Sequence, residues 1–274
     1  MNYELICCAV SKHEGRYLKH WIDWHHRLGV EKFVIYDEGS EHLALRELQD
    51  YCWSGLVEYV PATTHPVQYQ AYANCASRYA GRAKWILYID IDEFVNPYGL
   101  ESMDLKLWLR NYEYRSIAGV AIAWHCFGSN AENVYTPHPV WERITQRVDY
   151  EGAHPHSKHI KSFMRPEFIS EFNDPHWIKT KPGFVTVDPN MRVITISEYA
   201  ANDFPVDKIV LNHYSTKTKE EWLGKFARGS ADSGPDAYNA RKMEDFDRHM
   251  LACTRDDKTI LEVAAKIGLY APIV

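Results

Sequence analysis

Three carboxylates, Asp90, Asp92 and Glu93, follow directly after the apolar run Trp85–Ile89. In an extended chain, residues two positions apart point to the same side, so Asp90 and Asp92 are expected to face one crevice. Clustered carboxylates repel one another unless a cation or hydrogen bonds compensate. A divalent cation would compensate, and it could also bind the diphosphate of a nucleotide. The alternative is that one aspartate caps the following turn and the other is solvated.

The segments that must position these carboxylates alternate between apolar runs and helical periodicity. Apolar residues at helical spacing predict helices near residues 18–28, 43–51 and 68–79. Strands are predicted before, between and after these helices, at Leu5–Val10, Lys32–Tyr36, Val57–Val60 and Trp85–Ile89. This order predicts right-handed crossovers and a mostly parallel sheet.

Ligands of such sheets bind beyond the carboxyl ends of the strands. The polar segments Ser11–Glu14, Asp37–Ser40 and Asp90–Glu93 follow three of the predicted strands. We therefore expect these segments to line the binding site.

The second half of the chain has a different pattern. Apolar runs near 117–123, 144–148, 183–187, 192–196 and 208–211 predict strands without regular helices between them, which indicates an antiparallel extension of the sheet. Thr218 and Glu221 have the spacing of a capping box, which predicts a helix to about Ala227. A terminal helix is predicted over Asp257–Ile267, closed by Gly268.

These patterns predict a single α/β domain over residues 1–274. Within it we expect a nucleotide-binding half at 1–100, an acceptor-side half at 101–230 and a C-terminal helical segment at 231–274.

Composition narrows the class of protein. Apolar residues make up 46% and charged residues 25% of the 274 residues, as in soluble globular proteins. The net charge of −6 and the absence of a long basic run argue against a nucleic-acid partner. No apolar run is long enough to span a membrane, and the first residues do not resemble a signal peptide. The expected location is the cytoplasm, with peripheral contact at the inner face of a membrane left open.

Several motifs in order carry a resemblance to known enzymes. SKHEGRYLKHWIDWHHRLGVEKFVIYDEGS is followed by Gln70-x-x-x-Asn74, KWILYIDIDEF, Trp124–Ser129, Lys161–Pro166 and Leu211–Tyr214. This set resembles the family-2-like and family-92 glycosyltransferases, with His13 where asparagine is more usual. The resemblance implies a GT-A-like (Rossmann-like) fold, a nucleotide-sugar donor that is usually a UDP-sugar, and Mn²⁺ or Mg²⁺ as cofactor. It also implies transfer with inversion to a glycan or glycolipid acceptor.

The resemblance also implies roles for single residues. Asp37 corresponds to the carboxylate that recognises uracil, with Glu14 and Asn74 as further nucleotide contacts. Asp90 would face the ribose or a metal-bound water, and Asp92 and His213 would bind the metal. The structural alternatives are that Asp37 stabilises a turn, Glu14 caps a helix, Asn74 faces solvent and His213 is an ordinary core histidine.

Charge stabilisation and proton removal need further groups. Lys158, Lys161, Arg165 and Arg228 are candidates for the diphosphate, and Lys161 and Arg165 are preferred because they lie in a matching segment. A general base is also required; Glu142 is the first candidate and Asp174 the second, although both could be surface carboxylates. The small-residue segment 228–236 is expected to close over the donor.

Two other functions fit part of the sequence. A nucleotidyltransferase would also use carboxylates and a metal, but the segment SKHEGR has one glycine where a glycine-rich phosphate loop would be needed. A non-catalytic carbohydrate-binding protein would explain the 14% aromatic residues, but it would not need Asp90, Asp92 and His213.

Overall fold

The computed structural model describes residues 2–39, 41–62, 67–129, 133–149, 159–194, 204–228 and 243–270. The first half forms the predicted sheet, with strands β1 (Tyr3–Ser11), β2 (Lys32–Asp37), β3 (Val57–Pro61) and β4 (Ala83–Tyr88). These strands pair in parallel in the spatial order β3-β2-β1-β4. The helices that connect them are α1 (Gly15–Arg27), α2 (Glu41–Trp53) and α3 (Val67–Tyr79).

The central strand β1 is buried on both faces. Leu5, Cys7 and Ala9 pack in one core cluster with residues of α1, while the alternate residues Ile6, Cys8 and Val10 pack in a second cluster with α3. Successive side chains of a strand point to opposite faces. A strand covered on both faces therefore reads as a continuous apolar run, which is why the sequence predicted these strands correctly.

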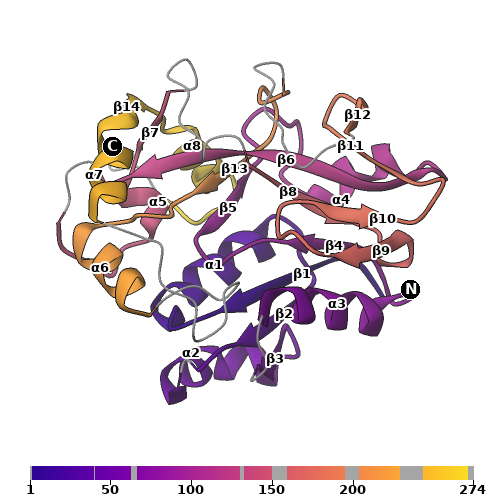
Figure 1. Ribbon diagram of the computed structural model, residues 1–274, viewed down its shortest axis with the longest axis horizontal. Helices are drawn as coiled ribbons and strands as arrows, with labels where there is room; N and C mark the ends of the chain where they lie inside the picture. Colours follow the sequence, from indigo (N-terminus) through magenta and orange to yellow (C-terminus); the bar gives the residue numbers. More distant parts are fainter. Residues whose placement is uncertain are drawn as a thin grey trace.

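The second half extends the same sheet, as Figure 1 shows in its upper part. Strand β8 (Ile160–Met164) lies antiparallel between β4 and the long β6 (Ile117–Gly128). The remaining strands are β5 (Glu93–Asn96), β7 (Gln146–Val148), β11 (Val185–Val187), β12 (Val193–Ile194), β13 (Val210–His213) and β14 (Cys253–Asp256).

This extension is mixed and not purely antiparallel as predicted. Strands β11 and β13 both run parallel to β6. Parallel pairing needs a long crossover, and long connections separate β6 from both strands in the chain. The topology of the first half, extended by β8 and β6, is the α/β GT-A-like arrangement that the sequence predicted.

Smaller elements complete the fold. A separate hairpin pairs β9 (Ile169–Phe172) with β10 (Ile178–Thr180). The helices are α4 (Leu105–Leu109), α5 (Val140–Arg143), α6 (Lys219–Arg228), α7 (Met243–Ala252) and α8 (Thr259–Lys266), with 3₁₀ turns η1 (Arg110–Tyr112) and η4 (Pro166–Phe168). The sequence analysis did not predict β5, β8, β9, β10, β14, α4, α5 or α7.

The predicted capping box of α6 is present. The Thr218 hydroxyl accepts from the Glu221 N–H at 3.2 Å, and the Glu221 carboxylate accepts from the Thr218 N–H at 3.0 Å. Helix α8 ends before Gly268, whose φ of 74° is the left-handed conformation that closes a helix.

No helix in the described part of the chain combines the length and apolar character needed to cross a membrane. The cytoplasmic location remains a prediction. All six cysteines are free thiols, and five of them are buried.

Candidate active site

The carboxyl ends of β1, β2 and β4 meet at one edge of the sheet. Ser11 pairs with Asp37 across β1 and β2, and Cys8 pairs with Tyr88 across β1 and β4. Beyond these pairs, the Glu38 N–H donates to the Ser11 carbonyl at 2.8 Å. The described residues of the three predicted polar segments therefore lie at a common edge.

Asp90 to Glu93 form a tight turn at this edge, and the expected extended geometry is wrong. The Glu93 N–H donates to the Asp90 carbonyl at 3.1 Å, while the Glu93 carboxylate accepts from the Asp90 N–H at 2.8 Å. The indole N–H of Trp21 lies 2.9 Å from the Glu93 carbonyl and 3.1 Å from the Asp90 carbonyl. Because the chain turns between them, Asp90 and Asp92 have different partners.

Helix α1 also holds the strand that follows the turn. The Trp24 indole donates to the Val95 carbonyl at 2.8 Å, and His25 Nε2 accepts from the Val95 N–H at 3.2 Å. His25 Nδ1 donates in turn to the Trp21 carbonyl at 2.8 Å. Burial lowers the pKa of His25 to about 3, so its ring is neutral and can accept this bond. The tryptophans and histidine of α1 thus position β5.

Asp90 is fixed by two side chains from other elements. Its Oδ1 accepts from Gln68 Nε2 of α3 at 2.8 Å, and its Oδ2 accepts from Lys161 Nζ of β8 at 2.9 Å. The Lys161 side chain is fully buried, and its Nζ also lies 3.9 Å from the Glu93 carboxylate. Burial alone would lower the pKa of Lys161, but the neighbouring carboxylates raise it well above its usual value. Lys161 is therefore a charged residue that holds Asp90 in place.

Asp92 and His213 are brought together by the pairing of β5 with β13. The two strands are antiparallel with His213 opposite Glu93, and the Tyr214 N–H donates to the Asp92 carbonyl at 2.9 Å. His213 Nε2 lies 3.5 Å from Asp92 Oδ1, and both side chains are largely buried. The His213 ring also packs against Trp124, with 3.9 Å between ring centroids.

Two lysines that the sequence analysis missed surround the same carboxylate. Lys225 Nζ of α6 donates to Asp92 Oδ2 at 2.6 Å, and Lys217 Nζ lies 3.6 Å from that oxygen. Burial would raise the pKa of Asp92, but Lys225, Lys217 and His213 lower it well below its usual value. The signal available in the sequence was their position, shortly after His213 and around the predicted capping box.

The predicted nucleotide contacts line other parts of the edge. Asp37 ends β2, is buried, and accepts from the Tyr59 hydroxyl at 2.7 Å. Asn74 lies on the exposed side of α3 and accepts from the Tyr36 hydroxyl at 2.7 Å. Glu14 precedes α1 but makes no side-chain capping bond there. Its carboxylate lies 3.8 Å from Lys217 Nζ, so it faces the Asp92 cluster instead.

The structure does not bring Arg165 to this edge. Met164 pairs with Ile86 and Ser162 with Tyr88, so β8 carries Arg165 away from the carboxyl end of β4. Its guanidinium donates to the carbonyls of Tyr114 and Ile117, both at 3.2 Å. Arg165 therefore secures the start of β6, and the predicted pairing of Lys161 with Arg165 at the diphosphate does not form.

The two general-base candidates lie in different surroundings. Glu142 belongs to the short helix α5, with its carboxylate 3.9 Å from His138 Nδ1. Asp174 Oδ1 accepts from the His176 N–H at 2.7 Å. The His176 ring packs against Trp124 at 4.8 Å between centroids, and Trp124 in turn contacts His213. Lys158 and residues 229–236 fall outside the described residues, and so does the side chain of Arg228.

Asp92 and His213 lie close enough together to hold one divalent ion, whose remaining ligands would include the phosphates of a nucleotide. Among the described residues, no group of three or more His, Cys, Asp or Glu side chains gathers as a metal site. The 3.5 Å between His213 Nε2 and Asp92 Oδ1 matches two ligands each about 2.1 Å from one ion. Mg²⁺ is commonly held by one or two carboxylates together with substrate phosphates. Asp92 and His213 would be the protein ligands of such an ion, with substrate phosphates as further ligands.

Comparison with known proteins gives the family. The chain matches the family model described as Glycosyltransferase family 92 over residues 6–250. It is 26% identical over 239 residues to a glycosyltransferase family 92 protein of Ricinus communis, covering 85% of this chain and 42% of that protein. A family 92 protein of Oryza sativa subsp. japonica is 26% identical over 247 residues, covering 85% and 39% respectively. The chain thus spans about two fifths of the length of these curated relatives.

Among solved structures, residues 1–349 of TarS from S. aureus superpose with a TM-score of 0.36 at 11% identity, covering 60% of this chain and 48% of that one. This low similarity adds nothing to the assignment, which rests on the match over residues 6–250. That match includes the Asp90–Glu93 turn, His213 and both lysines beside Asp92. The chain belongs to glycosyltransferase family 92.

Proposed function

We propose that this chain transfers a sugar from a nucleotide-sugar donor, a UDP-sugar, to a hydroxyl of a glycan or glycolipid acceptor, with inversion and with a divalent ion. The observation that carries the proposal is the pairing of Asp92 with His213 at the carboxyl edge of the sheet, next to the fixed Asp90. Ligands of such sheets bind beyond the carboxyl ends of the strands, so the diphosphate of the donor is expected to bind here.

The nucleotide would bind across the edge from β2 to β4. Asp37, held by the Tyr59 hydroxyl, would accept the N–H of the uracil base. Glu14 and Asn74 would supply further contacts, and Asp90 would face the ribose. Gln68 and Lys161 occupy both oxygens of Asp90 from the protein side, so the carboxylate keeps one orientation.

Asp92 and His213 would hold Mn²⁺ or Mg²⁺ against the diphosphate. Such an ion stabilises the negative charge that develops on the leaving diphosphate. The protein's own part is to fix both ligands, and the β5–β13 pairing together with the bond from Tyr214 to Asp92 does this.

A carboxylate must take the proton of the acceptor hydroxyl in an inverting transfer. Asp174 is now better supported than Glu142, because His176 and Trp124 connect its turn to His213. Glu142 remains the second candidate.

The alternative functions have less support. Family membership favours glycosyl transfer over nucleotidyl transfer. A lectin-like surface is also disfavoured, because Trp21, Trp24, Trp85 and Trp141 are fully buried and fill the core.

A melting-temperature screen with Mn²⁺ and UDP, GDP, ADP or CMP tests the proposal. UDP should stabilise the protein most, and a ligand at about 100 times its Kd adds about 2.7 kcal/mol to the free energy of unfolding. Hydrolysis of a UDP-sugar, measured with Mn²⁺ and with EDTA, gives a second readout. Equal stabilisation by GDP would contradict the uridine assignment, and no effect of any nucleotide would contradict the proposal itself.

A further inference from the structure

Two lysines and a histidine surround the carboxylate of Asp92, and the Glu14 carboxylate lies 3.8 Å from one of the lysines, Lys217. Lys225 Nζ lies 2.6 Å and Lys217 Nζ 3.6 Å from its Oδ2, while His213 Nε2 lies 3.5 Å from its Oδ1. Buried ammonium groups are costly unless they are paired. An ion bound to Asp92 would leave Lys225 without its carboxylate partner, so Lys225 would then need another anion.

We propose that Lys217 and Lys225 form a cationic clamp for the diphosphate of the nucleotide donor, and that Lys225 exchanges its bond to Asp92 for a bond to a phosphate oxygen. This inference rests on the proposed function and assigns residues within the same site. It also replaces Lys161 and Arg165, the cations that the sequence favoured for this role.

Lys161 is already committed to other carboxylates. Its side chain is fully buried, with Nζ 2.9 Å from Asp90 and 3.9 Å from Glu93. Moving Lys161 to a phosphate would leave Asp90 without the cation that orients it. Arg165 is directed to the start of β6. The described cations at Asp92 are better placed than either.

The two lysines have different freedom to move. Lys217 is only 4% exposed and is held from several sides, with Nζ 4.6 Å from the Tyr17 ring centroid and 3.8 Å from the Glu14 carboxylate. Lys225 is 15% exposed, and its other bond is to the Ser215 carbonyl at 3.1 Å. A lysine ammonium on a flexible four-carbon stem can redirect without backbone movement. Lys217 is therefore the fixed half of the clamp and Lys225 the movable half.

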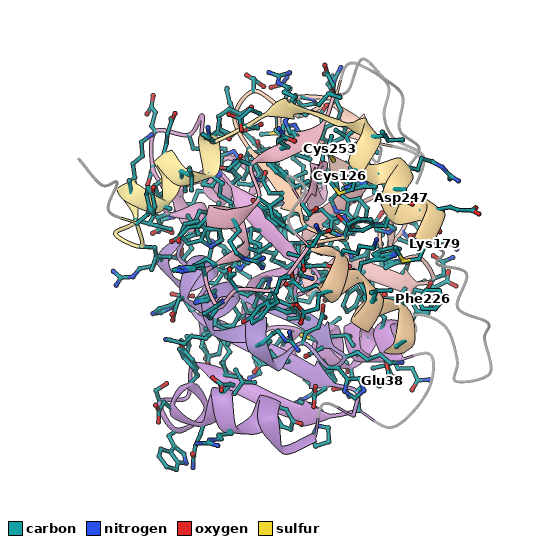
Figure 2. All side chains as sticks on the ribbon, turned by 90° about the vertical axis from the view of Figure 1, so that its left-hand side faces the viewer. Glu38, Cys126, Lys179, Phe226, Asp247 and Cys253 are labelled. Carbon is teal, nitrogen blue, oxygen red and sulfur yellow. The ribbon has the colours of Figure 1, made fainter. Side chains whose placement is uncertain are left out.

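Helix α6 presents Lys225 from a well-anchored position. The capping box fixes its first turn, and Glu221 of that turn also bonds the Tyr17 hydroxyl at 2.8 Å and pairs with Arg143 at 3.2 Å. Figure 2 shows α6, marked by Phe226, on the same side of the molecule as Glu38, which follows Asp37. The helix thus lies on the side where the nucleotide is proposed to bind.

The charges predict that the ion and the diphosphate bind together. Glu14 and Asp92 offset Lys217 and Lys225, so a divalent ion alone would add uncompensated positive charge to a buried cluster. An ion that arrives with a diphosphate brings its own counter-charge. Lys225 therefore has opposite effects on two ligands: it opposes Mn²⁺ by itself and favours UDP.

Isothermal titration calorimetry can test these opposite effects of Lys225. The titrants are Mn²⁺ alone, UDP together with Mn²⁺, and uridine. Lys225→Gln should bind UDP about tenfold to hundredfold more weakly, because a charge-assisted bond is lost. The same variant should bind Mn²⁺ alone severalfold more tightly and leave uridine binding unchanged. Lys225→Arg, which keeps the charge, should recover most of the UDP affinity. Lys219→Gln, an exposed residue of the same helix, is the matched control and should behave like the wild type.

Wild-type UDP affinity in Lys225→Gln would overturn the clamp and leave the proposed function standing. Weaker binding of both UDP and Mn²⁺ would also overturn it, since that is the effect of a merely structural lysine. Absence of UDP binding by the wild-type protein would overturn the proposed function, and the clamp with it.

Discussion

His213 Nε2 and Asp92 Oδ1 lie 3.5 Å apart, although strand pairing and not chain proximity brings them together. The antiparallel register of β5 and β13 sets His213 opposite Glu93, one residue after Asp92. The bond from the Tyr214 N–H to the Asp92 carbonyl continues this register past the end of β5. Backbone pairing between β5 and β13 therefore fixes the positions from which the two proposed metal ligands extend.

Replacing a proposed metal ligand should remove the metal dependence of nucleotide binding. His213→Ala and Asp92→Ala should each lower UDP affinity in Mn²⁺ to the level measured in EDTA, while the protein remains folded. Titration calorimetry measures the affinity and circular dichroism the fold. His26→Ala, at an exposed position of α1, is the control for loss of an imidazole. Full transferase activity in EDTA would show that no metal role exists.

The buried lysine at Asp90 should contribute much more to stability than a surface lysine. Lys161→Met leaves the Asp90 and Glu93 carboxylates without the cation they share, which should lower the free energy of unfolding by about 3–5 kcal/mol. Lys179→Met removes an exposed pair with Glu171 and should cost about 0–1 kcal/mol; Figure 2 labels Lys179 at the surface. Urea denaturation measures both. Similar losses in the two variants would contradict the role given to Lys161.

His25 should make stability depend on pH in the acid range. Its pKa is lowered to about 3 in the folded protein, against about 6.5 when unfolded, because burial disfavours the charged ring. Its contribution is therefore fully present above pH 6.5 and is lost as the pH falls toward 3, at about 1.4 kcal/mol per pH unit. Urea unfolding between pH 7.5 and about 5 should show a shallower slope for His25→Gln than for the wild type. An unchanged slope in His25→Gln would refute the assignment.

The general base can be separated from the donor site by kinetics. Asp174→Asn should lower kcat about 10²–10⁴-fold while UDP affinity is retained, because a base acts on the acceptor and not on the donor. Glu142→Gln is the comparison; its carboxylate, on α5, lies 3.9 Å from Nδ1 of His138, which precedes that helix. If Glu142→Gln loses activity and Asp174→Asn does not, Glu142 is the general base, as the sequence analysis favoured.

The orientation of Asp90 should depend on Gln68 and not on Gln70, although Gln70 is the glutamine in the motif Gln70-x-x-x-Asn74 that resembles the glycosyltransferases. Gln68 donates to Asp90 Oδ1 at 2.8 Å, whereas Gln70 is exposed on α3. Gln68→Ala should weaken UDP binding about tenfold, as expected for a lost hydrogen bond to a charged group. Gln70→Ala should leave the affinity unchanged, and equal effects of the two changes would contradict this role of Gln68.

The sequence by itself determined the elements whose residues interact locally or are buried on both faces. The continuous apolar runs predicted β1 to β4, the helical spacing predicted α1 and α3, and Thr218 with Glu221 predicted the start of α6. It also identified the polar segments of the binding edge, because the ends of parallel strands necessarily meet on one side.

Only the tertiary structure decided which side chains meet at that edge. Asp90 and Asp92 were expected to point the same way, but a turn held by Trp21 gives them separate partners. Lys161 pairs with Asp90, while β8 carries Arg165 away from the site. Lys217 and Lys225 reach Asp92 through the fold alone. The physical reason is that strand register and the reach of long side chains depend on contacts between residues distant in sequence, which local apolar patterns do not encode.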